Sequence, residues 1–288
     1  MNEKFVKFLK GGSLASTSVI KVKGKEVVQK KINLNHNREY GYYRWQSQLR
    51  ILLSYSNRWP DLFPEILDYG VNKEYAFYTI PYYGKVLNAY DFLIQKNLSS
   101  IQLKRLSENI LTAIKRVHKK KFGKKFHAWE LYYAEEIAYA MNSIPKKILS
   151  KNKVSLNGKL YLSLNQTKDE FYKVGESLLT NLEHSEVHGN LTLENILVSP
   201  NLSIMFIDPY FEVGVSSPLG DYAQLLQSSN SQYEKIMNQV NNNNFKLIDK
   251  YSLILNLPHN SNLEFINKTF IRHINLLNKK AYLKVRWL

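Results

Sequence analysis

The sequence predicts an α+β fold in which a small sheet-and-helix part, residues 1–84, precedes a larger and mainly helical part, residues 85–288. Three observations predict it. Short strand-like runs bounded by turn residues occur early in the chain. From residue 99 onward, apolar residues recur at three- and four-residue steps. The chain has 288 residues and is 44% hydrophobic, which is enough for a substantial core in one large domain or two small ones.

The first strand signal lies in residues 11–32, where a small-residue run precedes two short apolar segments. Val19–Val22 and Val27–Lys30 are separated by a Gly24-Lys25 turn, which predicts a tight hairpin. In the run ahead of it, the backbone N–H groups of Gly12 and Ser13 could face a phosphate. An ordinary turn is the alternative interpretation of that run.

A helix is predicted next, over residues 37–53, where aromatic and aliphatic residues recur at helical spacing. Asn37 is the candidate N-cap. Glu39 falls in the first turn, where a carboxylate is favourable toward the helix dipole. Residues 75–80 then predict a strand that ends at Pro81.

The second part of the chain is predicted to be mainly helical. Ser100 is the candidate cap of a helix over residues 101–118, and further helices are expected over residues 128–141, over residues 168–182 and in the tail. A short strand is expected over residues 159–164. The basic run from Lys115 to Lys125 is either a solvated face or a phosphate or membrane contact.

The stretch 187–208 combines two apolar runs, residues 196–198 and 204–207, with a Ser-Pro-Asn turn between them, which predicts a second hairpin. Asn190 and Asn195 lie five residues apart before it, and Asp208 ends it. An Asp after four apolar residues faces a desolvation cost of several kcal/mol unless a positive group pairs with it. A metal ion would meet that need, and the three polar side chains could converge.

The pattern H-G-x-x-x-x-x-N followed by I-D-P resembles the catalytic and metal-binding loops of the aminoglycoside-phosphotransferase-like and choline-kinase-like small-molecule kinases. The resemblance implies a two-lobed, protein-kinase-like fold with ATP between a small N-terminal β-sheet lobe and a larger, mainly helical C-terminal lobe. It also implies that Asn195 and Asp208 ligate Mg²⁺.

Motifs in the same order as in that family extend from residue 11 to residue 228. The resemblance implies that Lys30 reaches the nucleotide phosphates, with Lys31 as the competing choice, and that Glu39 pairs with the lysine. Val28 would cover the adenine.

The strand end at Pro81 would then be the hinge between the lobes. Since Pro81 has no N–H, an adenine edge would use the Ile80 carbonyl and the Tyr82 N–H. Further along, Asp221 matches an Asp that anchors the catalytic loop in the family, and it is also a candidate helix N-cap.

The sequence departs from the family at the catalytic base. The family pattern is H-G-D, whereas this chain has His188-Gly189-Asn190. An amide cannot accept a proton as a carboxylate does, so Asn190 occupies the base position without the base chemistry. Asn190 is either a native residue or an introduced Asp-to-Asn change.

The function expected from the resemblance is phosphoryl transfer from ATP to a hydroxyl of a small molecule. The F-I-D-P and L-L-Q-S segments point by analogy to a sugar or sugar derivative of surface-glycan metabolism. The net charge of +16 favours a neutral or anionic acceptor over a polycationic one. The alternative is a pseudokinase that binds nucleotide as a scaffold or regulator. A basic nucleic-acid or membrane binder is the least favoured class.

Composition excludes several other classes. The absence of Cys rules out thiolate catalysis, disulfides and cysteine zinc clusters. No apolar run reaches the 18 or so residues of a membrane span, and the first residues do not start a signal-peptide pattern. We therefore expect a cytoplasmic location.

Overall fold

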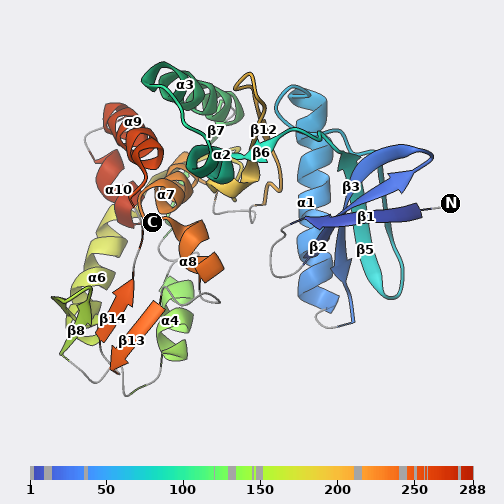
Figure 1. Cartoon of the computed structure of the whole chain (residues 1–288). Helices are drawn as coiled ribbons and strands as arrows, with labels where there is room; N and C mark the ends of the chain where they lie inside the picture. The colour runs from blue at the N-terminus through green and yellow to red at the C-terminus, as the bar shows by residue number, and fades with distance from the viewer. Residues whose placement is uncertain are drawn as a thin grey trace. The chain divides into compact units, whose positions relative to one another are not determined.

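In the computed structural model the chain is an α+β protein that combines a small antiparallel sheet with helices (Figure 1). The structure describes residues 3–9, 15–35, 38–119, 121–128, 134–144, 146, 152–210, 216–239, 245–249, 252–255, 257, 259–277 and 280–287. The chain divides into two units. The first comprises Met1–Phe92 and His188–Phe211, and the second comprises Leu93–Val187 and Glu212–Leu288. The lobe boundary expected after residue 84 stays a prediction.

The first unit contains a five-stranded antiparallel sheet with the strand order β1-β2-β3-β5-β4. Its strands are β1 (Glu3–Leu9), β2 (Ala15–Val22), β3 (Lys25–Asn33), β4 (Asp68–Val71) and β5 (Tyr75–Pro81). The edge strand β1 was not predicted from the sequence.

The hairpin of β2 and β3 confirms the first predicted hairpin. Val22 pairs with Lys25, so the turn consists of Lys23 and Gly24, one residue earlier than expected. Both turn residues have positive φ, 49° for Lys23 and 82° for Gly24. Two such residues match the twist of the flanking strands, which is why Gly is favoured here.

Helix α1 (Arg38–Arg58) packs against the sheet beside β3 and β5 (Figure 1). The contact is close at Gly41, where an added Cβ would lie 3.2 Å from Cγ2 of Ile32. Trp45 is buried on the same helix. The predicted helix is confirmed and extends further, while its predicted cap Asn37 lies outside the described residues.

A three-stranded sheet completes the first unit, with the order β12-β11-β6. It consists of β6 (Leu87–Asn88), β11 (Ile196–Val198) and β12 (Ile204–Phe206), and the one-turn 3₁₀ helix η2 (Leu193–Asn195) precedes β11. The second predicted hairpin is thereby confirmed.

Aromatic packing attaches this late segment to the N-terminal part of the same unit. The Phe63 and Phe206 ring centroids lie 5.7 Å apart, and the N–H of Phe206 donates to the Leu62 carbonyl at 2.7 Å. Phe63 and Phe206 are both fully buried. The core of the first unit therefore requires residues from two distant parts of the chain.

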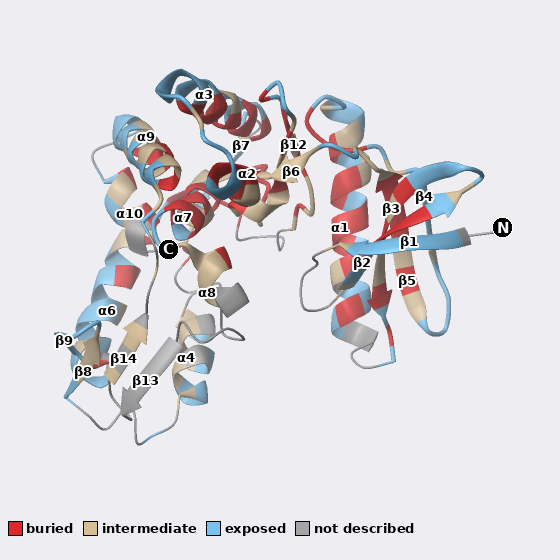
Figure 2. Ribbon diagram, viewed as in Figure 1, coloured by how far each residue is buried: buried red, intermediate tan, exposed pale blue. Residues whose placement is uncertain are grey.

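The second unit holds most of the helices, of which α9 packs against α3, α7 and α10, and α10 also packs against α7. The helices outside the first unit are α3 (Ser100–Val117), α4 (Ala134–Ser143), α6 (Leu164–Leu178), α7 (Pro218–Ser229), α8 (Tyr233–Gln239), α9 (Ser261–Leu277) and α10 (Ala281–Trp287), and α2 (Ala89–Gln95) begins in the first unit and ends in the second. Buried residues form a stripe along α3 (Figure 2). Among the described helices, none combines the length and the apolar character that crossing a bilayer requires.

The cap predicted for α3 is wrong by one residue. The N-cap is Ser99, whose hydroxyl accepts from the N–H of Gln102, and the Gln102 side chain accepts in return from the N–H of Ser99. Ser100 is instead the first helical residue. This reciprocal pair is a capping box, and a Gln three residues after Ser99 was the available signal.

The second unit also contains two small sheets. β7 (Lys121–Phe126) pairs with β10 (Leu182–Ser185), and the other sheet has the order β13-β14-β8-β9. Its strands are β8 (Lys153–Leu156), β9 (Lys159–Leu162), β13 (Phe245–Asp249) and β14 (Ser252–Leu255). The helix predicted over residues 168–182 is shifted to Leu164–Leu178 because Leu182 belongs to β10.

Candidate functional site

An ion pair between Lys30 and Asp208 marks the candidate site in the first unit. The Lys30 Nζ lies 2.7 Å from Asp208 Oδ2, and the two side chains are 12% and 28% exposed. Lys30 belongs to β3, and Asp208 follows β12 by two residues. The positive partner that the apolar run before Asp208 required is therefore a side chain of the protein itself.

Tyr78 holds the other oxygen of the same carboxylate. Its hydroxyl donates to Asp208 Oδ1 at 2.9 Å, and the side chain is 1% exposed. Tyr78 is the cross-strand partner of Lys30 in the β3–β5 ladder. Sequence reasoning missed this residue, although the register of β3 and β5 would have placed it opposite Lys30.

The carboxyl group of Asp208 is ionised at neutral pH. Burial alone would raise its pKa, but the charge of Lys30 and the hydrogen bonds from Lys30 and Tyr78 outweigh that effect and lower the pKa. The same burial, together with the Asp208 charge, raises the pKa of the Tyr78 hydroxyl well above its usual value. Tyr78 therefore stays protonated and acts as the donor.

Strand periodicity extends the site along one face of the sheet. Val28 pairs with Ile80, and Lys30 pairs with Tyr78, two residues away on each strand. Because side chains two residues apart share a face, these four lie on one face of the sheet. The patch thus places two apolar side chains beside the ammonium and the hydroxyl.

Lys31 points away from this patch. Its Nζ lies 3.4 Å from the centroid of the Tyr75 ring, a cation–π contact on the opposite face. Between the two lysines that the sequence left open, only Lys30 contacts Asp208 among the described side chains.

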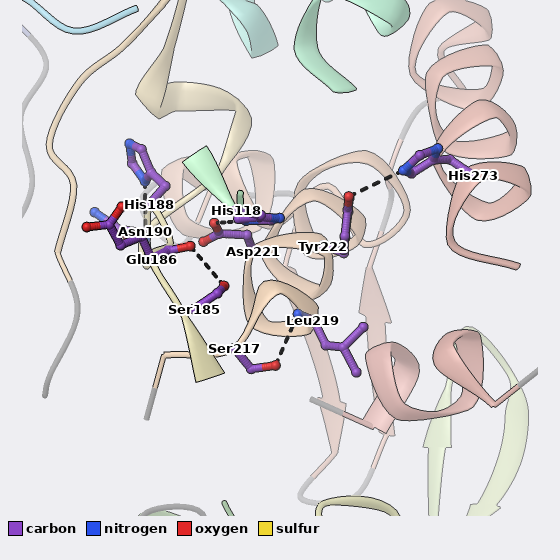
Figure 3. A network of polar contacts seen from close by, with 10 residues as sticks. All are labelled: His118, Ser185, Glu186, His188, Asn190, Ser217, Leu219, Asp221, Tyr222 and His273. Carbon is purple, nitrogen blue, oxygen red and sulfur yellow. Dashed lines mark hydrogen bonds and ion pairs between the residues drawn. The ribbon is translucent and has the colours of Figure 1, made fainter. Parts of the chain in front are cut away.

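His188 is buried and orients the loop that follows it. Its Nδ1 accepts from the N–H of Asn190 at 3.3 Å (Figure 3), so the proton lies on Nε2, which donates to the Ile207 carbonyl at 3.0 Å. The ring also stacks on Phe63 at 6.2 Å between centroids. His188 therefore connects the loop to the end of β12 through both nitrogens of its ring.

Asn190 and Asn195 are linked to each other and to Asp208 through hydrogen bonds. Asn190 Nδ2 donates to the Asp208 carbonyl at 3.3 Å, and Asn195 Nδ2 donates to the Asn190 carbonyl at 2.6 Å. The N–H of Ile207 donates in turn to the Asn195 carbonyl at 3.0 Å. The three polar residues that the sequence singled out are thus brought together.

Other sequence-derived site residues are not part of this geometry. Gly12 and Ser13 lie outside the described residues, and so does the side chain of Glu39, although its backbone is helical. Their predicted roles stay predictions. Tyr82 directly follows β5, and its ring lies 5.2 Å from the Lys7 Nζ.

The side chains of the site could hold a hard cation such as Mg²⁺ only if a bound molecule and water supplied most of the coordinating oxygens. Within the described part of the chain, no group of three or more His, Cys, Asp and Glu side chains could hold a metal ion. Asp208 offers a carboxylate, and Asn195, whose nitrogen is engaged, would offer its amide oxygen. Mg²⁺ is commonly held by one or two such groups plus phosphate oxygens and water, so the set fits a metal–nucleotide.

The second unit contains a separate polar network. His118 Nε2 lies 2.8 Å from Asp221 Oδ2, and the Tyr222 hydroxyl lies 3.3 Å from His273 Nε2 (Figure 3). The prediction that Asp221 is an N-cap is wrong. Ser217 caps α7 by accepting from the N–H of Leu219, and Asp221 is a 1%-exposed residue of the first turn.

No protein-family model matches the sequence, and no curated protein is significantly similar to it.

Proposed function

We propose that the chain is a two-lobed, protein-kinase-like protein of the cytoplasm that binds ATP with Mg²⁺ and transfers a phosphoryl group to a hydroxyl of a small molecule. The observation that carries the proposal is the Lys30–Asp208 ion pair at 2.7 Å. It joins a cation suited to phosphate and a carboxylate suited to Mg²⁺, and both are among the residues that the family resemblance singled out.

The surroundings of the pair support this function. Lys30 would hold the nucleotide phosphates, Val28 on the same face would cover the adenine, and the Ile80 carbonyl would bind the adenine edge. Glu39 would pair with Lys30, and the backbone of Gly12, Ser13 and Tyr82 would contact the nucleotide. Asn195 and Asp208 would hold Mg²⁺, which when bound neutralises charge on the phosphates.

The acceptor would approach Asn190, whose loop the buried His188 ring holds in place. The Asn190 amide can orient a hydroxyl by hydrogen bonding, but it cannot take the proton. Transfer would therefore be slow, since positioning and charge would act without a base. The net charge of +16 supports a neutral or anionic acceptor, and a sugar or sugar derivative remains the favoured class.

A second candidate function is nucleotide binding without transfer, as in a scaffold or regulator. It is favoured by the hydrogen bond from Asn190 Nδ2 to the Asp208 carbonyl. A carboxylate at position 190 could not donate this bond and would face the carbonyl oxygen instead. The amide thus has a structural role that an Asp would not fill.

Thermal unfolding with nucleotide tests the proposal. ATP with Mg²⁺ should raise the Tm, because a ligand that binds only the folded state stabilises it. Asp208→Ala should remove most of the Mg²⁺-dependent part of that rise. A wild-type Tm that does not change at millimolar Mg·ATP would rule out a nucleotide site. Binding without ATP consumption, over a panel of sugars and nucleosides, would select the second candidate.

A further inference from the structure

Asp208 has an unusual backbone conformation that its neighbours maintain. Its φ is 55°, in the left-handed region that residues with a side chain rarely adopt. Such a conformation persists only where surrounding contacts over-determine it. Here those contacts come from Lys30 and Tyr78 on the carboxylate and from Asn190 on the carbonyl.

The two partners of the carboxylate differ in their freedom to move. Lys30 ends in a flexible four-carbon chain, and its ammonium can turn to a phosphate while its backbone stays in β3. Tyr78 has a rigid ring on β5 and is 1% exposed, so its hydroxyl has no such freedom. The two hydrogen bonds to Asp208 are therefore not equivalent.

We propose that Tyr78 is a positioning residue that keeps the Asp208 carboxylate in place for a metal-bound nucleotide when the Lys30 ammonium turns to the phosphates. This inference rests on the proposed nucleotide function. Tyr78 occupies Oδ1, which leaves Oδ2, the oxygen that Lys30 now contacts, to face the cation. The two carboxylate oxygens have enough lone pairs to accept the Tyr78 hydrogen bond at Oδ1 and to contact the cation at Oδ2 at the same time.

The proposal predicts a specific energetic signature for Tyr78→Phe. Without nucleotide, the variant keeps the Lys30–Asp208 pair. With Mg·ATP bound, Lys30 contacts the phosphates, and the variant then lacks the hydrogen bond that Tyr78 donates to the Asp208 carboxylate. The affinity for Mg·ATP should fall about tenfold, the size of one hydrogen bond to a charged group. The affinity for ATP in EDTA should stay the same.

Isothermal titration of the full chain with ATP, in Mg²⁺ and in EDTA, measures both quantities. Tyr75→Phe is the matched control, since Tyr75 lies on the same strand and contacts Lys31 rather than Asp208. It should change neither affinity. In an Asp208→Asn background, Tyr78→Phe should cause a much smaller further loss.

Several outcomes would overturn the inference. Equal losses in Mg²⁺ and in EDTA would mean that Tyr78 is merely structural, and an unchanged Mg·ATP affinity would mean that it has no positioning role. Wild-type protein that does not bind Mg·ATP would instead refute the proposed function. Should Tyr78→Phe not fold, NMR of ring-labelled tyrosine in the wild type decides. The hydroxyl proton of Tyr78 should stay protected from exchange when Mg·ATP saturates the protein, and loss of that protection counts against the proposal.

Discussion

His118 and Asp221 are 103 residues apart in sequence and form a contact of 2.8 Å in the second unit. His118 is the C-cap residue of α3, and Asp221 lies in the first turn of α7. Their side chains are 9% and 1% exposed. The pair therefore connects the end of one helix to the start of another through a buried polar contact.

Asp221→Ala should lower the free energy of unfolding by about 3 kcal/mol, because it removes a buried acceptor from the His118 ring. Asp221→Asn should cost less, since its amide oxygen can still accept. Urea denaturation measures both. Glu108→Ala, which removes an exposed i,i+4 pair on α3, is the control and should have little effect. Similar losses for Asp221→Asn and Asp221→Ala would show that the charge, rather than the hydrogen bond, matters.

Asn190→Asp should restore a general base to the loop. If the chain carries out phosphoryl transfer, turnover should rise at least roughly a hundredfold, since a positioned base is worth about 10²–10⁴ in rate. The ATP affinity should change by no more than a few-fold. ATP consumption by both forms, against a panel of sugars and nucleosides, measures the effect.

Asn190→Asp also carries a structural cost, because it loses the hydrogen bond to the Asp208 carbonyl. We expect its Tm to be slightly lower than that of the wild type. If the wild type is already fast, position 190 does not hold the base. If the Asp form binds ATP and stays inactive with every acceptor, the scaffold function gains support.

Lys30→Met should lower both nucleotide affinity and stability, because it removes the cation beside Asp208. The partly exposed carboxylate keeps its bond from Tyr78, so we expect a loss of stability of about 1–3 kcal/mol. Lys31→Ala is the matched control on the opposite face and should leave ATP affinity nearly unchanged. Fluorescence or calorimetric titration compares them. Equal losses of ATP affinity in the two variants would mean that the face of β3 that carries Lys30 is not the phosphate-binding face.

Two glycines should respond to Ala in opposite directions. Gly24 has a φ of 82° in the hairpin turn, so Gly24→Ala should destabilise the protein by about 1–2 kcal/mol. Gly220 lies in α7 with open space around a built Cβ, so Gly220→Ala should stabilise it by roughly 0.5–1 kcal/mol. Chemical denaturation of both variants checks the signs. A Gly24→Ala variant whose free energy of unfolding equals that of the wild type would contradict the turn geometry.

Stability should fall as the pH drops below about 6.5, in part through His273. Burial and the nearby charge of Lys115 lower the pKa of His273, whose ring faces the Tyr222 hydroxyl. Since the unfolded chain then binds the proton more readily, protonation favours unfolding. The drop in Tm between pH 7.5 and pH 5.5 should be smaller for His273→Gln. An equal drop in both proteins would mean that His273 does not contribute.

The parts of the fold that sequence predicted are local ones. The hairpin of β2 and β3 follows from strand alternation around Gly24, and α3 follows from its apolar periodicity. By contrast, β14 pairs in parallel with β8, with Ser252 opposite Ser155. Nothing in either segment specifies a partner so distant in the chain, which is why this sheet was not foreseen.

The same distinction between local and distant relationships separates the site residues that the sequence indicates from those that it does not. Asn190, Asn195 and Asp208 stand out because polar residues interrupt apolar runs at fixed spacing. Tyr78 does not stand out, since it lies within an aromatic strand and its hydroxyl matters only through the register with Lys30. The sequence predicts a cap at Asp221 because an acidic residue near a helix start suits either an N-cap or a position facing the helix dipole.

The discontinuity of the first unit constrains the order of events during synthesis. Residues up to Phe92 leave the ribosome before the segment that begins at His188, so Lys30 and Tyr78 emerge long before their carboxylate does. The β2–β3 hairpin can form early, but the Phe63 ring can pack against Phe206 only after Phe206 has been synthesised. We therefore expect nascent chains that stop short of residue 208 to carry Lys30 without its acidic partner and to remain dependent on chaperones until residue 208 has been synthesised.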